Sequence, residues 1–106
     1  MIIDDEDADF NEDGMRTYRG IFLTGSVVEK LEGGTIVSEI AYKDGVRDDT
    51  TRSFYYSGAK QTEGNYHLGV PVGTHRTWYE NGKLQSEMEF DDLGQVQSRK
   101  HWPNQD

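Results

Sequence analysis

The sequence repeats itself every 24 residues, and three copies align without a gap. Glycine, glutamate, a tyrosine or phenylalanine, a basic residue and a second aromatic residue each return at fixed places in the copy. The aligned columns are Gly34, Gly58 and Gly82; Glu39, Glu63 and Glu87; Tyr42, Tyr66 and Phe90; Arg52, Arg76 and Lys100; and Phe54, Trp78 and Trp102. We divide the chain into a degenerate first copy over residues 14–33 and full copies over 34–57, 58–81 and 82–106.

The pattern inside each copy predicts two β-strands separated by tight turns. Asn81-Gly82 is a strong hairpin signal, because both residues tolerate the positive φ that a two-residue type I′ turn requires. Asp44-Gly45 and Leu68-Gly69 mark a second turn in the copy. Segments 35–43 and 83–91 alternate apolar and polar residues, as strands do. We therefore predict an all-β fold, an antiparallel meander of stacked hairpins with no helix longer than a turn.

A two-residue loop at Asn81-Gly82 also predicts the register of the strands that it joins. The expected pairs are Tyr79 with Leu84, Trp78 with Gln85, and Arg76 with Glu87. The same count in the preceding copy places Arg52 opposite Glu63, so we interpret the arginine and glutamate columns as cross-strand ion pairs. One sheet face would then carry these charges together with Phe54, Trp78 and Trp102. The other face would carry Leu84, Met88, Phe90 and Tyr79.

The composition limits the chain to a single domain with a thin core. The chain has 106 residues, of which 33% are apolar, and its 2 Trp, 6 Tyr and 4 Phe concentrate that apolar surface in rings. It contains no cysteine, which excludes disulfides and thiolate metal sites. We see neither a basic, apolar leader nor a run of about 20 apolar residues. We expect a cytoplasmic protein.

Negative charge is concentrated at the start of the chain. Of the 20 acidic residues, seven lie in residues 1–13 without a basic residue, which leaves 13 acidic against 11 basic residues elsewhere. We predict that residues 1–13 form a flexible acidic tail beside a repeat domain over residues 14–106. Nucleic acids and anionic membranes repel such a chain, so we expect it to bind neither. A protein partner with a basic surface is expected instead.

The residues give little support for a metal site or for catalysis. Asp9, Asn11, Asp13 and Gly14 fit the start of a calcium loop, but Gly20 stands where the closing glutamate should be. His67, His75 and His101 have no metal-binding spacing, although His75 and His101 could approach each other on neighbouring strands. No serine nucleophile motif is present. We expect no cofactor and no enzymatic activity.

The segment from Gly73 to Gly94, GTHRTWYENGKLQSEMEFDDLG, resembles the variant form of the MORN repeat. The matching residues are Trp78, Tyr79, Asn81, Gly82, Lys83, Leu84, Glu87 and Phe90. The resemblance covers residues 34–106 with decreasing fidelity, and Asp49 and Gln97 depart from the Gly73 column. It implies a single-layered, twisted antiparallel sheet of stacked hairpins. It also implies similarity to bacterial antitoxin or immunity proteins that are built from such repeats.

Two functions follow as hypotheses. The first is an immunity protein or antitoxin that neutralises a cognate toxin by direct occlusion. Its binding residues would be aromatic and acidic: Phe54, Tyr56, Trp78, Trp102, Asp48, Asp49, Glu89, Asp91 and Asp92. The alternative is a structural or scaffolding repeat module without a toxin partner, which associates with itself through open sheet edges.

Overall fold

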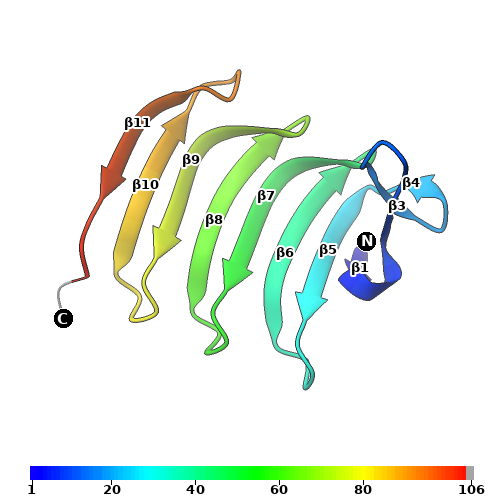
Figure 1. The fold of residues 1–106 in the computed structure, drawn as a ribbon, viewed down its shortest axis with the longest axis horizontal. Coiled ribbons are helices and arrows are strands. Elements are labelled where there is room, and N and C mark those ends of the chain that lie inside the picture. The colour runs from blue at the N-terminus through cyan, green and yellow to red at the C-terminus, as the bar shows by residue number, and fades with distance from the viewer. Residues whose placement is uncertain (105–106) are drawn as a thin grey trace.

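The computed structural model describes residues 1–104, which form two β-sheets and one short 3₁₀ helix. The main sheet contains, in spatial order, β1 (Ile2–Asp4), β5 (Gly25–Lys30), β6 (Ile36–Lys43), β7 (Val46–Phe54), β8 (Lys60–His67), β9 (Val70–Trp78), β10 (Leu84–Phe90) and β11 (Val96–His101). The small sheet contains β2 (Asp9–Phe10), β3 (Arg16–Tyr18) and β4 (Ile21–Phe22), and the helix is η1 (Asp5–Asp7). The predicted all-β meander is confirmed, because every strand from β5 to β11 pairs antiparallel with the next one along the chain. Figure 1 shows these strands side by side in one curved layer.

The 24-residue period corresponds to one pair of adjacent strands. The copy over residues 34–57 contains β6 and β7, the copy over 58–81 contains β8 and β9, and β10 and β11 lie in the last copy. Equivalent side chains of successive copies therefore lie two strands apart, in rows that cross the sheet. The arginine, glutamate and aromatic columns of the repeat form such rows.

The prediction of a two-residue turn at Asn81-Gly82 is wrong. The Tyr79 N–H donates to the Lys83 carbonyl at 2.8 Å and the Gly82 N–H donates to the Tyr79 carbonyl at 2.9 Å, so the turn spans five residues. Gly82 has a φ of 90°, whereas Asn81 is not among the residues with positive φ. The Asn81 side chain instead accepts the Lys83 N–H at 3.0 Å. An asparagine that caps the turn with its side chain leaves the left-handed conformation to glycine alone.

Two-residue turns occur at the other end of the strands, between β6 and β7 and between β8 and β9, whereas the β10–β11 turn at that end spans the five residues from Asp91 to Gln95. Asp44 and Gly45 have φ values of 50° and 87°, and Leu68 and Gly69 have φ values of 51° and 85°. Two consecutive residues with positive φ are the signature of a type I′ turn. Leu68 thus holds a conformation that is unfavourable for a leucine.

The predicted register is wrong next to the turn and correct beyond it. Gln85 is an extra residue in β10, so Trp78 lies opposite Leu84 and not opposite Gln85. Leu84 therefore shares the face of Trp78, contrary to the prediction. An extra residue of this kind is a β-bulge, and it also recurs with the 24-residue period, at Val37 and Gln61.

Past the bulge the two predicted ion pairs are in register. Arg76 lies opposite Glu87, and Arg52 lies opposite Glu63. The five-residue turn shifts the register by one residue and the bulge shifts it back. Two departures from the expected hairpin therefore cancel, which is why the pairs further along the strands were predicted correctly.

The N-terminal acidic segment is part of the fold, whereas we predicted a flexible tail over residues 1–13. β1 pairs parallel with β5, and Ile3 lies opposite Val27. Only 7% of the surface of Ile3 and 8% of that of Ala8 are exposed. These two apolar side chains point inward while the acidic side chains around them stay outside, an arrangement that the net charge of the segment does not reveal.

The core lies at the N-terminal end of the main sheet. It consists of Ile3, Ala8, Leu23, Val27 and Tyr42, with Tyr18 and Ile40 packed against it. Tyr18 of β3, with Ala8 just before β2 and Leu23 just after β4, brings the small sheet against the main sheet there. Among the residues of β7 to β11, only Gly64 is buried. Both faces of this larger part of the sheet are accessible to a partner.

Candidate partner-binding face

A row of alternating charges crosses one face of the sheet, which we call the charged face. Arg52 Nε donates to Glu63 Oε2 at 2.8 Å, and Arg52 Nη1 reaches Glu39 at 3.4 Å. One copy further on, Arg76 Nε donates to Glu87 Oε2 at 2.8 Å. The arginine and glutamate columns of the sequence thus meet as ion pairs between neighbouring strands.

Glu63 is the most strongly held carboxylate of this row. Lys60 Nζ donates to its Oε2 at 3.0 Å in addition to the bond from Arg52. These two donors, Lys60 foremost, lower the pKa of Glu63 below its ordinary value. Glu63 therefore stays ionised under mildly acidic conditions and is not available as a proton donor at neutral pH.

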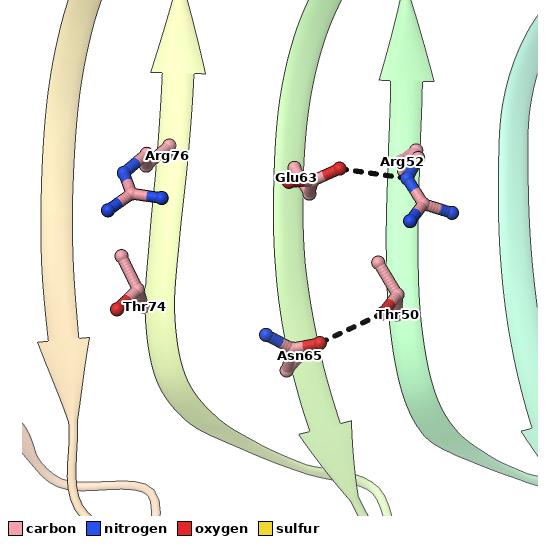
Figure 2. Close-up of a pocket in the computed structure, with 6 residues that line it drawn as sticks. All are labelled: Thr50, Arg52, Glu63, Asn65, Thr74 and Arg76. Carbon is pink, nitrogen blue, oxygen red and sulfur yellow. Dashed lines mark hydrogen bonds and ion pairs between the residues drawn. The ribbon is translucent and has the colours of Figure 1, made fainter.

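A shallow hollow of about 400 Å³ opens in the middle of the charged face. It is lined by Thr50, Arg52, Glu63, Asn65, Thr74 and Arg76. Figure 2 shows the Glu63 side chain turned toward Arg52, with Thr50 Oγ1 donating to Asn65 Oδ1 at 2.9 Å. Two threonines and two arginines line the hollow, because positions 50 and 52 are equivalent to positions 74 and 76 in the next copy of the repeat. The hollow presents hydroxyl, amide and guanidinium groups that can form hydrogen bonds with a protein surface.

An apolar row, which we call the aromatic band, borders the charged face along the five-residue turns. Its residues are Ile36, Phe54, Trp78, Leu84 and Trp102, with Lys60 between them. The pairing of Phe54 with Lys60 and of Trp78 with Leu84 brings these side chains to one face. Lys60 Nζ lies 5.2 Å from the centre of the Trp78 ring. The predicted shared face of Phe54, Trp78 and Trp102 with arginine and glutamate agrees with this arrangement.

Two tyrosines hold this band in place. The Tyr55 hydroxyl donates to the Trp78 carbonyl at 2.8 Å, and the Tyr79 hydroxyl donates to the Trp102 carbonyl at 2.8 Å. Each bond ties one copy to the next across 23 residues. We did not predict this role. The signal for it was the recurrence of tyrosine after the aromatic column.

The predicted acidic binding residues lie at the far end of the strands from the aromatic band. Asp48 and Asp49 lie in the first half of β7, and Glu89, Asp91 and Asp92 are at or just after the end of β10. Asp49 and Phe54 are five residues apart on β7, or about 17 Å, so the acidic and aromatic groups do not form one compact site. Tyr56 lies in the turn next to the aromatic band, where it lines a hollow together with Phe54, and 80% of its surface is exposed.

Several of these acidic residues also stabilise the fold. Glu89 accepts the Thr74 hydroxyl at 2.6 Å. Asp91 accepts the backbone N–H groups of Leu93 and Gln95 at 2.9 and 2.8 Å, and so caps its turn. Asp49 has a φ of 74°, close to the 68° of Gly73 in the next copy. The departure from glycine at position 49 therefore leaves the local backbone unchanged.

The opposite face carries a ring cluster that the sequence did not reveal. His75 contacts Tyr66 and Phe90 edge-on, with ring centres 5.4 and 4.7 Å apart. Its Nε2 is 2.8 Å from the Asn65 carbonyl. The ring lies over buried Gly64, whose missing side chain makes room for it. This histidine is packed among aromatic groups, and β10 separates it from His101 on β11.

The remaining metal-binding pattern of the sequence forms a turn. Asn11 Oδ1 accepts the N–H groups of Asp13 and Met15, both at 2.9 Å, so this oxygen is engaged within the β2–β3 connection. Among residues 1–104 there is no group of three His, Cys, Asp or Glu side chains placed to hold a metal ion. No helix in the same residues is long and apolar enough to cross a membrane.

Comparison with known proteins places one segment of the chain in a family. Residues 71–92 match the family model described as the MORN repeat variant. This segment spans most of β9, the five-residue turn and β10, and it includes Trp78, Arg76 and Glu87. Searches of curated proteins and of solved structures gave no significant match. The chain therefore contains a repeat of the MORN variant type in the hairpin formed by β9 and β10.

Proposed function

We propose that this protein is an immunity protein or antitoxin, which binds a cognate toxin with a basic surface and neutralises it by direct occlusion. The observation that carries the proposal is the fixed negative charge at one end of the molecule. The seven acidic residues of the N-terminal segment belong to a folded element, not to a loose tail. Charges held in place create a directed field, which steers an oppositely charged protein into a defined encounter.

The acidic end continues along one rim of the sheet. β3, which pairs with β2 of the N-terminal segment, adjoins the Asp44-Gly45 turn, where the Arg16 N–H donates to the Gly45 carbonyl at 2.9 Å. Asp48 and Asp49 begin the next strand, and the turn that holds Asp91 and Asp92 lies on the same rim. Two basic residues, Lys43 and Arg47, lie among the acidic residues of this rim, but the acidic residues outnumber them. A basic toxin would meet this acidic rim first.

The size of the sheet supports occlusion as the mode of inhibition. The molecule measures 47 × 38 × 20 Å, so its broad side has an outline of roughly 1,800 Å². A stable protein interface buries about 800 Å² on each partner. The charged face and aromatic band lie on that broad side and combine rings with ion pairs, as binding hot spots do. One such face is large enough to cover the active site of another protein.

The test is capture of the toxin followed by its inhibition. We expect the tagged protein to recover one dominant basic protein from the source cells, to form a complex of fixed stoichiometry, and to abolish the toxicity of that protein. Asp48→Asn with Asp92→Asn should slow association at low salt, and the difference should shrink at high salt. Glu29→Gln with Glu32→Gln, two exposed positions next to the β5–β6 turn on the opposite rim, is the matched control. Failure to recover a protein whose toxicity is inhibited would overturn the proposal.

A self-associating scaffold is the second candidate, and the exposure of β11 favours it. Within residues 1–104, β11 is the edge strand of the main sheet at the end away from β1, and all six of its residues are exposed. An exposed strand edge can pair with another chain. Light scattering over a range of protein concentrations separates the two functions. A scaffold should form larger assemblies by itself as its concentration rises. An antitoxin should keep the same mass at every concentration until its toxin is added.

A further inference from the structure

The aromatic band has a regular spacing that matches one kind of ligand. Phe54, Trp78 and Trp102 occupy equivalent positions in successive copies. Phe54 and Trp78 are the last residues of β7 and β9, and Trp102 directly follows β11, where its N–H donates to the Gln85 carbonyl at 2.9 Å. Neighbouring strands lie about 4.8 Å apart, so the three rings follow one another at intervals of about 9.6 Å. The row runs across the strands. A ligand that contacts all three rings must therefore lie across the strands and repeat at that interval.

Three regular peptide conformations can be compared with this interval. A β-strand returns to the same side every two residues, or about 6.7 Å. An α-helix returns to nearly the same side after seven residues, or about 10.5 Å, which accumulates a mismatch of about 1.8 Å over the two intervals. A polyproline II helix repeats every three residues, or about 9.3 Å, so its mismatch is only about 0.6 Å. The polyproline II helix fits best.

The chemistry of the band agrees with this conformation. Proline rings pack on aromatic side chains, and the backbone carbonyls of a polyproline II helix have no internal partners. The indole N–H groups of Trp78 and Trp102 can donate to such carbonyls, since neither donates a hydrogen bond within residues 1–104. Trp102 is 39% exposed. A hollow of about 260 Å³ beside Phe54, bounded by Tyr56 and Gln61, offers room for a side chain.

We propose that the aromatic band binds a proline-rich segment in the polyproline II conformation, with one proline-containing turn over each of Phe54, Trp78 and Trp102. The inference rests on the proposed function in one respect, because it assigns that segment to the toxin. The tyrosine bonds to the Trp78 and Trp102 carbonyls would keep the rings at their spacing before the ligand arrives. A preformed row binds a preformed helix with little loss of conformational entropy.

Intrinsic fluorescence provides a direct assay, because the only two tryptophans of the chain both belong to the band. Titration with decaproline should shift the emission and saturate, whereas a Gly-Ser peptide of equal length should leave it unchanged. A peptide with proline at every third residue should bind more tightly than one with proline at every fourth residue. Absence of saturable decaproline binding, or equal affinity for the two spaced peptides, would overturn the inference.

Variants locate the binding on the band. Phe54→Ala should weaken decaproline binding about tenfold while both tryptophans remain as reporters. Phe54→Leu keeps an apolar side chain without an aromatic face, so it should weaken binding as well, with the fold verified by circular dichroism. Leu93→Ala, at a position 79% exposed on the far rim, is the control and should bind as the unchanged protein does. Equal binding by Phe54→Leu and the unchanged protein would count against the site.

The outcome is separable from that of the proposed function. Recovery of an inhibited toxin together with a negative decaproline titration would overturn only the present inference. Decaproline binding without any recovered toxin would overturn the antitoxin function and leave the peptide site intact. The two experiments share no reagent other than the protein.

Discussion

Replacement of Gly64 by alanine tests how the opposite face is packed. Gly64 lies in the same repeat column as Ile40 and Met88, so two copies place a large side chain where the middle copy has none. The His75 ring occupies that space. A Cβ added at Gly64 would overlap the ring and lie 2.7 Å from its Cγ. The ring would have to leave its position for the alanine to fit.

The energetic consequence follows from the contacts that hold the ring. Displacing it breaks the hydrogen bond to the Asn65 carbonyl, a loss of about 1 kcal/mol, and two edge-on ring contacts at about 0.5–1.5 kcal/mol each. Alanine offsets about 0.5–1 kcal/mol through the lower entropy of its unfolded state. The net loss in free energy of unfolding is about 1–3 kcal/mol. In a chain of this size each 1 kcal/mol corresponds to a fall in Tm of about 4–8 °C.

A double-mutant cycle separates overlap with the ring from other effects. We would measure urea unfolding by circular dichroism for the parent, Gly64→Ala, His75→Ala and the double variant. Gly64→Ala should be strongly destabilising in the parent, and neutral or slightly stabilising once His75 is alanine. An equal loss in both backgrounds would refute the reasoning, because the loss would then arise from the backbone of β8. A parent unaffected by Gly64→Ala would refute it as well.

Three further predictions concern stability and can be measured by urea unfolding. Leu68→Asn should raise the free energy of unfolding by about 0.5–1 kcal/mol, because asparagine adopts a φ of 51° more readily than leucine; no gain would contradict the assigned turn. Glu63→Gln should lower it by up to about 1 kcal/mol at pH 7. The folded pKa of Glu63 is lowered, so its contribution exists above the ordinary pKa and should be lost as the pH falls through the lowered pKa; a difference that persists after Glu63 is protonated would argue against the ion pair. Asp5→Asn should cost about 1–3 kcal/mol, since it removes the partner of the buried Arg16 guanidinium. Asp7→Asn is its control, and an equal effect of the two would mean that the N-terminal segment does not pack as described.

The local hairpin plan and part of the charged face were predictable from the sequence. Alternation of side chains along a strand and the recurrence of glycine at turns are short-range effects, so a 24-residue repeat reveals them. The pairing of Arg52 with Glu63 followed from counting outward from a turn. The same count placed Leu84 on the wrong side of the sheet, because a single inserted residue reverses the alternation of side chains between the two faces. The bulge at Gln85 leaves no compositional mark.

The sequence by itself determined the β class, the strand pairs of the three full copies, and the ion pairs of Arg52 with Glu63 and Arg76 with Glu87, because each depends on residues that are close along the chain. Only the tertiary structure decided three other features. It brought Ile3 into the core, seated the His75 ring over Gly64, and separated the acidic rim from the aromatic band. Ile3 meets segments that are distant in sequence, and the acidic rim and the aromatic band lie at opposite ends of the strands. Gly64 and His75 are close in sequence, but the placement of the ring over the glycine depends on how side chains of neighbouring strands pack. Such contacts are set by how the chain closes on itself, and no local pattern of residues encodes that.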